Sequence, residues 1–365
     1  MSIISSNIPK MSTGKMAKTL ASAYVGLING GKPLRLMPSV MLWGAPGVGK
    51  SQGVRHIAEL IGQRTGKRVT VTDVRLLLFN PIDLRGIPTA NAEKTLAVWL
   101  KPKIFDMDPS EGVVNILFLD EISAAPQSVQ AAAYQITLDR VVGEHKLPEN
   151  CIVISAGNRL TDKSVAYKMP KALANRLMHI EIDADFDSWL EWAVARGINP
   201  RVIGFLSFKR DYFIEEGASE DLAYPTPRSW EMVSNVLNSV DPGSDSVFSL
   251  VSGLVGVGIA EELRSFFELY RDLPSVESIF LGKAVAVPKR ADLLYALTSS
   301  MTAYARTVKD DMQKIEASIR FAMGMPPDFS AILLRSYMYL ESGYKQRLMR
   351  LPSFARWAER AGKFL

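Results

Sequence analysis

The chain has 365 residues, of which 47% are hydrophobic and 22% charged, with a formal net charge of +5. This composition is ordinary for a globular protein, and the length suggests two domains. The single cysteine excludes an internal disulfide framework, and the N-terminal segment lacks the apolar core of a signal peptide. The longest uncharged, mostly apolar run, residues 247–260, is shorter than the roughly 20 residues of a membrane-spanning helix. We therefore expect a cytoplasmic protein without a membrane partner, and a buried helix or helix pair at 247–260.

The first half of the sequence alternates between helical and extended patterns. Residues 14–30 form an amphipathic pattern that ends at a Gly-Gly pair, and helical patterns return at 50–62 and 126–140. Short apolar or β-branched runs lie between and after them, at 38–43, 67–74, 113–121, 151–158 and 179–182. This alternation predicts an α/β domain over residues 1–184, with a parallel five-stranded sheet and helices on both faces.

From residue 185 onwards the pattern is helical. Gly197 follows one amphipathic segment as a C-terminal cap, and the Asn199-Pro200 and Thr226-Pro227 pairs are typical helix starts. We expect an all-helical domain over 185–300 and a helical C-terminal extension over 301–365.

The stretch GAPGVGKS, residues 44–51, predicts a phosphate-binding loop. It fits the pattern G-x-x-x-x-G-K-[ST] and lies between a predicted strand and a predicted helix, which is the order that the mechanism needs. Its glycines let backbone N–H groups surround an anion at a helix N-terminus. Lys50 would reach the β- and γ-phosphates, and Ser51 would ligate Mg²⁺. The predicted nucleotide-binding residues are Gly44, Ala45, Pro46, Gly47, Val48, Gly49, Lys50, Ser51 and Gln52.

Two carboxylates follow the most apolar predicted strand. Asp120 would hold Mg²⁺ through water, and Glu121 would orient and deprotonate a water for attack on the γ-phosphate. Asn158, at the end of another strand, could hold that water against Glu121. Taken alone, Asn158 would be a turn-forming residue.

Two arginines complete the set of predicted catalytic residues. Arg228 lies near the start of a helix, where a cation is disfavoured by up to about 1 kcal/mol unless an anion is nearby. A nucleotide phosphate would be such an anion, and the alternative is an ion pair with Glu231. Arg176 precedes the last predicted strand and could serve the γ-phosphate of a neighbouring subunit, whereas the alternative is a salt bridge at the edge of the core.

Lys50, Asp120–Glu121, Asn158, Arg176 and Arg228, in this order, resemble the Walker A, Walker B, sensor 1, arginine-finger and sensor 2 positions of the AAA+ ATPases. The segments NPIDLRGIP (80–88), VWLKPKIF (98–105), LDRVVGEHKLPEN (138–150) and YPTPRSWEMVS (224–234) are similar to features of the MoxR branch. The third of these is expected to be a hairpin. The resemblance covers roughly residues 14–240.

The resemblance implies a magnesium-dependent ATPase that forms a ring, usually a homo-hexamer. It implies that Arg176 acts on the neighbouring subunit, and that the helical domain is a lid carrying Arg228. It further implies chaperone-like remodelling of a partner protein, often one with a von Willebrand factor A domain. Segments 80–88 and 143–145 would be pore loops, but they offer no aromatic residue for gripping a threaded chain.

The C-terminal segment 345–365 holds six basic residues and one acidic residue, which accounts for the whole net charge. Phe354, Trp357, Ala358 and Ala361 share one face of a predicted helix, opposite Arg356, Arg360 and Lys363. We expect a docked terminal helix, and the alternative is a docking element for an acidic partner. Because the charge sits in one terminal segment, nucleic-acid binding is not favoured.

Other functions use the same motifs. A clamp-loader-like or initiator-like ATPase would bind DNA in a salt-dependent way. A small-molecule kinase would need an acceptor and would have no role for Arg176. A slow switch would bind ATP to assemble and hydrolyse it only to reset, and the sequence does not separate this switch from a ring remodeller.

Overall fold

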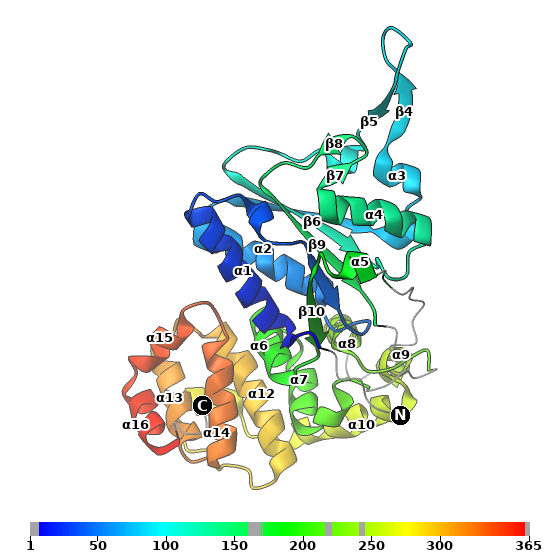
Figure 1. The fold of residues 1–365 in the computed structure, drawn as a ribbon. Helices are drawn as coiled ribbons and strands as arrows, with labels where there is room; N and C mark the ends of the chain where they lie inside the picture. Colours follow the sequence, from blue (N-terminus) through cyan, green and yellow to red (C-terminus); the bar gives the residue numbers. More distant parts are fainter. Residues whose placement is uncertain (1–6, 160–168, 170, 216–220, 241–244, 362–365) are drawn as a thin grey trace. The chain divides into compact units, whose positions relative to one another are not determined.

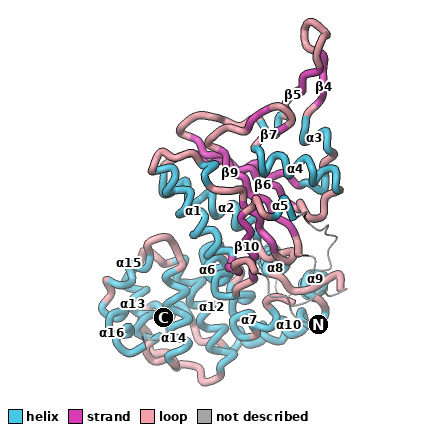
Figure 2. Tube along the Cα trace, in the orientation of Figure 1, coloured by secondary structure: helices cyan, strands magenta, loops and turns pink. Residues whose placement is uncertain are grey.

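The computed structural model describes residues 7–159, 169, 171–215, 221–240 and 245–361 (Figure 1). The chain divides into two compact units, Met1–Asp185 and Phe186–Leu365. Among the described residues, the strands all lie in the first unit (Figure 2). The three-part division predicted from the sequence stays a prediction.

The first unit is built on a parallel sheet of six strands in the order β1-β10-β2-β9-β6-β3. The strands are β1 (Lys10–Ser12), β2 (Val40–Trp43), β3 (Arg68–Arg75), β6 (Val113–Asp120), β9 (Cys151–Gly157) and β10 (Met178–Asp183). The expected parallel sheet is confirmed, but the expected number of five strands is wrong. The additional strand, β1, pairs with the edge of β10 just before the first helix.

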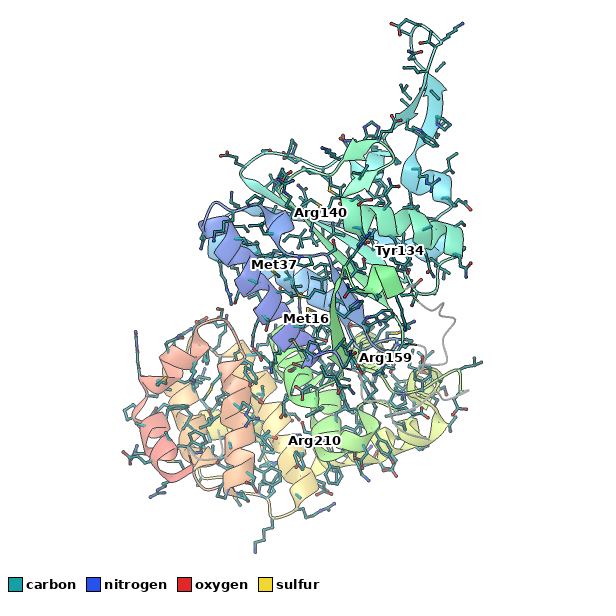
Figure 3. All side chains as sticks on the ribbon, in the orientation of Figure 1. Met16, Met37, Tyr134, Arg140, Arg159 and Arg210 are labelled. Carbon is teal, nitrogen blue, oxygen red and sulfur yellow. The ribbon has the colours of Figure 1, made fainter. Side chains whose placement is uncertain are left out.

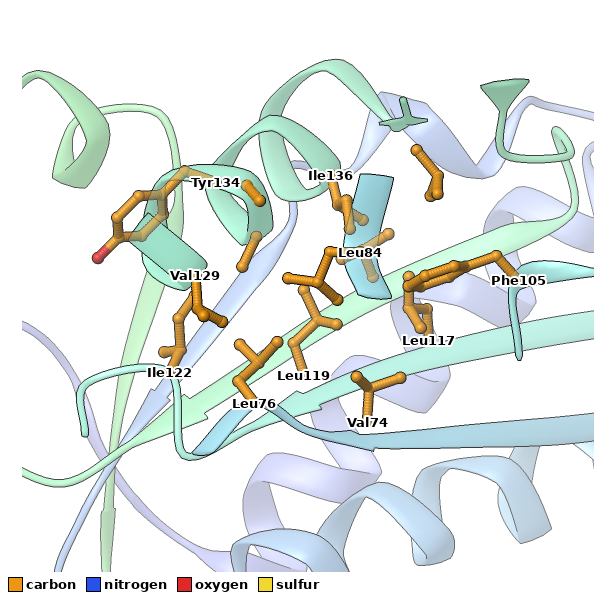
Figure 4. Packing of buried hydrophobic residues seen from close by; sticks show 14 of the residues in the cluster. Val74, Leu76, Leu84, Phe105, Leu117, Leu119, Ile122, Val129, Tyr134 and Ile136 are labelled. Carbon is orange, nitrogen blue, oxygen red and sulfur yellow. The ribbon is translucent and has the colours of Figure 1, made fainter. Parts of the chain in front are cut away.

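Helices cover both faces of this sheet. On one face, Val129, Ala133 and Ile136 of α4 (Gln127–Asp139) pack on Leu117 and Leu119 of β6 (Figure 4). Successive side chains of a strand point to opposite faces, so Asp120 lies on the other face. That face carries α2 (Lys50–Thr65), whose Ser51 hydrogen-bonds Asp120, and α1 (Thr13–Asn29) packs against α2.

Two hairpins accompany the sheet. The short α3 (Pro81–Arg85) leads into β4 (Ile87–Ala90) and β5 (Ala97–Leu100), an antiparallel pair that projects away from the sheet (Figure 1). The sequence showed segments 80–88 and 98–105 as separate motifs, whereas the structure joins them through the Ile87–Leu100 pair. The second hairpin, β7 (Val141–Val142) and β8 (His145–Lys146), confirms the expected hairpin within 138–150.

One glycine lies at a close backbone approach within the first hairpin, and another lies where the second hairpin meets α3. Gly86 and Gly143 both have positive φ angles, of 94° and 60°. A β-carbon on Gly86 would overlap the carbonyl oxygen of Leu100, and one on Gly143 would overlap that of Arg85. His145 Nε2 lies 2.7 Å from the carbonyl oxygen of Trp99. Segment 80–88 and the turn at 143–145, both predicted to be pore loops, therefore lie against one another. Phe79, the residue just before segment 80–88, packs against the buried cluster that contains Leu84 and the apolar face of α4.

The described part of the second unit is helical, as expected. Its helices are α6 (Phe186–Arg196), α7 (Pro200–Phe208), α8 (Pro227–Ser239), α9 (Asp245–Val255), α10 (Val257–Glu268), α11 (Val276–Phe280), α12 (Ala291–Thr307), α13 (Met312–Ala322), α14 (Pro327–Met338), α15 (Tyr344–Met349) and α16 (Pro352–Ala361). Asn199 and Thr226 cap α7 and α8 through their side chains. Gly256, with a φ of 88°, separates α9 from α10, so the apolar run at 247–260 is a helix pair.

The C-terminal helix α16 is docked on the second unit. Phe354 and Trp357 are buried, and Trp357 Nε1 donates a hydrogen bond to Ser330 Oγ at 2.9 Å. The amide and hydroxyl of Ser353 both donate to Glu316 Oε1, at 3.1 and 2.6 Å. The expectation of a docked terminal helix is confirmed for these residues. In the described part of the chain, none of the helices has the length and apolarity that crossing a membrane requires.

Candidate nucleotide-binding site

The predicted phosphate loop connects β2 to α2. Gly47 and Gly49 adopt φ angles of 81° and 94°, in the left-handed region that favours glycine. A β-carbon on Gly44 would lie 2.7 Å from the carbonyl oxygen of Ile182 on the neighbouring strand β10. The helix α2 begins at Lys50, so the N–H groups of its first turn and the positive end of its dipole face the loop. The backbone thus has the conformation that an anion cradle needs.

Lys50 lies across this loop. Its Nζ donates to the carbonyl oxygens of Gly44 and Ala45, at 2.6 and 3.0 Å, and to Asn158 Oδ1 at 3.0 Å. Asn158 follows β9, the strand beside β2. The ammonium group is therefore held between the loop and the end of the adjacent strand. In this position it could donate to an oxygen of a phosphate bound in the loop.

Ser51 and Asp120 bring a hydroxyl and a carboxylate together. Ser51 Oγ donates to Asp120 Oδ2 at 3.2 Å, and Asp120 Oδ1 accepts from the amide of Glu121 at 2.9 Å. Mg²⁺ prefers such oxygen ligands, and it usually keeps several waters beside one or two carboxylates and substrate phosphates. The donor set of Ser51 and Asp120 fits this ion.

Glu121 has a strained backbone. Its φ of 60° places it in the left-handed region, which a residue with a β-carbon rarely adopts. Its carbonyl oxygen accepts from the amides of Ala124 and Ala125, at 3.0 and 3.2 Å, while Ile122 donates to the carbonyl of Ala156 on β9. These bonds hold a tight turn at the end of β6. Such strain is common at functional sites, where the surrounding structure over-determines it.

Asn158 is fixed from both sides. Its backbone N–H donates to Ser123 Oγ at 2.9 Å, and its side-chain oxygen accepts from Lys50 Nζ. Its side-chain oxygen therefore helps to hold the ammonium group of Lys50 in place. The structure thus brings Lys50 close to Asn158 and Ser51 close to Asp120, at the carboxyl ends of neighbouring parallel strands.

The two predicted arginines take no part in these contacts. Arg176 is exposed in the turn between α5 (Lys171–Ala174) and β10, and Arg228 is exposed at the second position of α8. Among the described residues, neither side chain forms an ion pair, so the alternatives of a core-edge salt bridge and a pair with Glu231 are not observed. Both guanidinium groups lie at the surface.

The structure also shows supporting residues that the sequence did not indicate. Thr13 Oγ1, at the start of α1, donates to the carbonyl of Val48 in the loop at 3.0 Å. Arg159, which follows Asn158 and is labelled in Figure 3, forms a 2.7 Å ion pair with the buried Glu181 of β10. Glu181 also pairs with Lys10 of β1. These contacts join residues far apart in the chain, and no local pattern marks them.

Asp73 is a further carboxylate at this end of the sheet. It lies on β3, two residues before the partner of Asp120 in the strand register, and so on the same face. Desolvation raises the pKa of Asp73, and the Asp120 carboxylate raises it further, while Arg55 and Arg75 lower it. Spacing in the sequence did not indicate this residue, because it follows no recognised motif.

Residues 39–179 match the family model described as "ATPase family associated with various cellular activities (AAA)". The match contains the loop, Asp120, Glu121, Asn158 and Arg176, and it covers less than half of the chain. No curated protein matches the sequence closely enough to count as a relative.

Solved structures that this chain matches include a point mutant of RuvB from Thermotoga maritima. It is 17% identical, with a TM-score of 0.39, and the alignment covers 81% of this chain and 85% of that one. A DNA polymerase III gamma subunit-related protein from the same organism is 12% identical, with a TM-score of 0.36, over 95% of this chain and 99% of that one.

Proposed function

We propose that this chain is a magnesium-dependent ATPase of the AAA+ type, in the MoxR-like branch. One observation carries the proposal: the contacts of Lys50 with Asn158 and of Ser51 with Asp120 occur at the carboxyl ends of adjacent strands, beside a loop in the phosphate-binding conformation. The family match over 39–179 supports it, since that segment contains these four residues.

The loop residues 44–52 would bind the phosphates of ATP. Backbone N–H groups and the N-terminus of α2 attract the anion, and Lys50 exchanges its present carbonyl acceptors for phosphate oxygens. Ser51 and Asp120 would hold Mg²⁺, which neutralises charge on the β- and γ-phosphates when it is bound. Thr13 supports the loop from α1 through the carbonyl of Val48.

Hydrolysis would use Glu121 as the general base. Its carboxylate takes a proton from the attacking water, and Asn158, already held by Lys50 and Ser123, orients that water. Arg176 would come from a neighbouring subunit and stabilise the charge on the transferred phosphoryl group. Arg228 would act from the helical unit as a lid residue. The exposure of both arginines, without ion pairs among the described residues, supports these roles.

We infer that the ring is a homo-hexamer in the cytoplasm and remodels a protein partner, such as one with a von Willebrand factor A domain. The projecting β4–β5 hairpin favours a protein over a nucleic acid as partner. The hairpin has four exposed apolar residues, which are Ile87, Leu96, Val98 and Leu100. Between 37% and 68% of the surface of each is exposed to solvent. Exposed apolar patches mark protein–protein sites, whereas nucleic-acid surfaces are basic.

The testing experiment measures ATP hydrolysis per subunit against protein concentration, with and without double-stranded DNA, using Lys50→Ala as the inactive control. Specific activity that rises with concentration and ignores DNA supports a site completed by a neighbour. Stimulation by DNA would favour a nucleic-acid ATPase. A flat activity from a protein that sizing shows to be a monomer would contradict the ring and favour a kinase or a switch.

A further inference from the structure

His179 of β10 lies between two hydrogen-bond partners. Trp43 Nε1 lies 2.9 Å from His179 Nδ1, and His179 Nε2 lies 2.7 Å from the carbonyl oxygen of Ala174. An indole N–H can only donate, so Nδ1 must accept. The imidazole proton is thereby assigned to Nε2, which donates to the Ala174 carbonyl. Two bonds therefore set both the tautomer and the plane of the ring.

The first partner belongs to the phosphate loop's own strand. Trp43 is the last residue of β2, and the next residue, Gly44, is one of the carbonyl acceptors of Lys50. The indole and imidazole rings are nearly parallel, at 20°, with centroids 6.1 Å apart. A side-chain hydrogen bond therefore joins the end of β2 to His179, in addition to the backbone pairing of β2 with β10.

The second partner belongs to the turn that carries Arg176. Ala174 ends α5, and its carbonyl also accepts from the amide of Leu177 at 3.3 Å, which closes the turn around Arg176. Leu177 is buried, whereas the Arg176 side chain is exposed and has no ion pair in the described part of the chain. Because no ion pair with another described residue holds the guanidinium group, its position depends on the backbone of this turn.

We propose that His179 is a positioning residue that joins the phosphate loop's strand to the Arg176 turn, and so aims the arginine offered to the neighbouring subunit. This inference rests on the proposed function of Arg176. His179 contacts the Trp43 indole and the Ala174 carbonyl. It acts through the Ala174 carbonyl, and it makes the geometry of the arginine dependent on the β2 strand of its own subunit.

Two substitutions test the two hydrogen bonds of His179 separately. His179→Asn keeps an acceptor near the position of Nδ1 but loses the donor to Ala174, and His179→Gln keeps a donor near Nε2 but loses the acceptor for Trp43. We expect each to lower kcat for ATP at least tenfold while ATP affinity changes less than twofold. Trp43→Phe removes one bond, keeps the aromatic ring, and should lower kcat similarly. Circular dichroism and ATP binding report that each variant is folded.

The decisive test mixes subunits. A ring of His179→Ala and Lys50→Ala subunits should recover hydrolysis, because a His179→Ala subunit can bind ATP and receive a well-placed Arg176 from its Lys50→Ala neighbour. Mixing His179→Ala with Arg176→Ala should recover none, because every interface then lacks a correctly held arginine. Wild-type kcat in both the His179→Asn and His179→Gln variants would overturn the proposal.

The mixed rings also separate this inference from the function on which it rests. If Arg176→Ala with Lys50→Ala recovers activity but His179→Ala with Lys50→Ala does not, the arginine acts in trans and His179 does not position it. If neither mixture recovers, the trans role of Arg176 fails, and the positioning role of His179 fails with it.

Discussion

Glu121 combines a strained backbone with the carboxylate that we assign as the general base, so substitutions at this position should separate stability from catalysis. Its φ of 60° places the β-carbon in a conformation that costs about 1–2 kcal/mol. Glu121→Gly and Glu121→Ala both remove the carboxylate. We expect both variants to bind ATP and to lose hydrolysis by about 10²–10⁴-fold, the usual contribution of a positioned base.

The stabilities of the two variants should differ in favour of glycine. Glycine relieves the strain of the left-handed backbone. It also gives the unfolded chain more conformational entropy, which lowers the free energy of unfolding by about 0.4–1 kcal/mol relative to alanine. At the middle of these two ranges, the difference leaves Glu121→Gly more stable than Glu121→Ala by about 0.8 kcal/mol. For a unit of this size, that corresponds to a melting temperature about 1–4 °C higher.

Scanning calorimetry of both variants measures this difference, and Glu59 provides a matched control. Glu59 is an exposed residue inside α2 of the same unit, where the backbone is helical. There the sign should reverse, with Glu59→Gly less stable than Glu59→Ala by about 1 kcal/mol. If Glu121→Gly melts below Glu121→Ala, the backbone at this position is not strained. If either Glu121 variant hydrolyses ATP at the wild-type rate, Glu121 is not the base.

Four further substitutions and measurements test the site and the fold. Lys50→Ala should abolish ATP binding in titration calorimetry, and unchanged affinity would contradict the loop assignment. Arg176→Ala should keep ATP binding and lose hydrolysis by about 10³-fold or more; an unchanged rate would remove its catalytic role. Trp357→Ala should lower the free energy of unfolding by about 3–5 kcal/mol, measured by denaturant titration, because the ring is buried and bonded to Ser330; a negligible loss would mean that α16 is not docked. Burial raises the pKa of Cys151 to about 12, so a thiol reagent at neutral pH should label it only as fast as the protein unfolds, and rapid labelling of the native protein would contradict its burial.

Much of the fold was predictable because the relevant strands are buried on both faces. The segments of β6 and β9 are apolar runs interrupted only by Asn115 and Ser155 before they end, which is typical of central strands in a parallel sheet. The helices of the second unit were predictable from their caps, such as Thr226 before Pro227. In both cases the pattern lies within the element itself: a buried strand needs apolar side chains, and a helix start needs a cap.

The elements that sequence reasoning missed lack such a pattern. β1 has three residues and exists only because β10 offers an edge for pairing. The β4–β5 hairpin has almost no buried residues, so neither of its strands shows alternation between apolar and polar positions. Tertiary pairing, and not local propensity, determines these elements.

The candidate site was partly predictable for a topological reason. Polar residues at the ends of adjacent parallel strands must converge on one edge of the sheet, so the Lys50–Asn158 and Ser51–Asp120 contacts follow once the strand order is known. The residues that hold the site in place were not predictable. Thr13 and His179 act through side-chain contacts with segments far away in the chain, and contacts of this kind leave no spacing in the sequence.

These supporting contacts share one feature, which is that each joins the strand ends or loops around the phosphate site to an outer segment. Thr13 ties the loop to α1, His179 ties β2 to the Arg176 turn, and Glu181 ties the end of β9 to β10 and β1. A loop whose glycines permit the anion cradle has little stiffness of its own. Its geometry must therefore come from outside, from strands packed in register on either side. We therefore expect a change at the phosphate loop to reach β10 and the Arg176 turn through the 2.9 Å bond from Trp43 to His179 and the 2.7 Å bond from His179 to the Ala174 carbonyl.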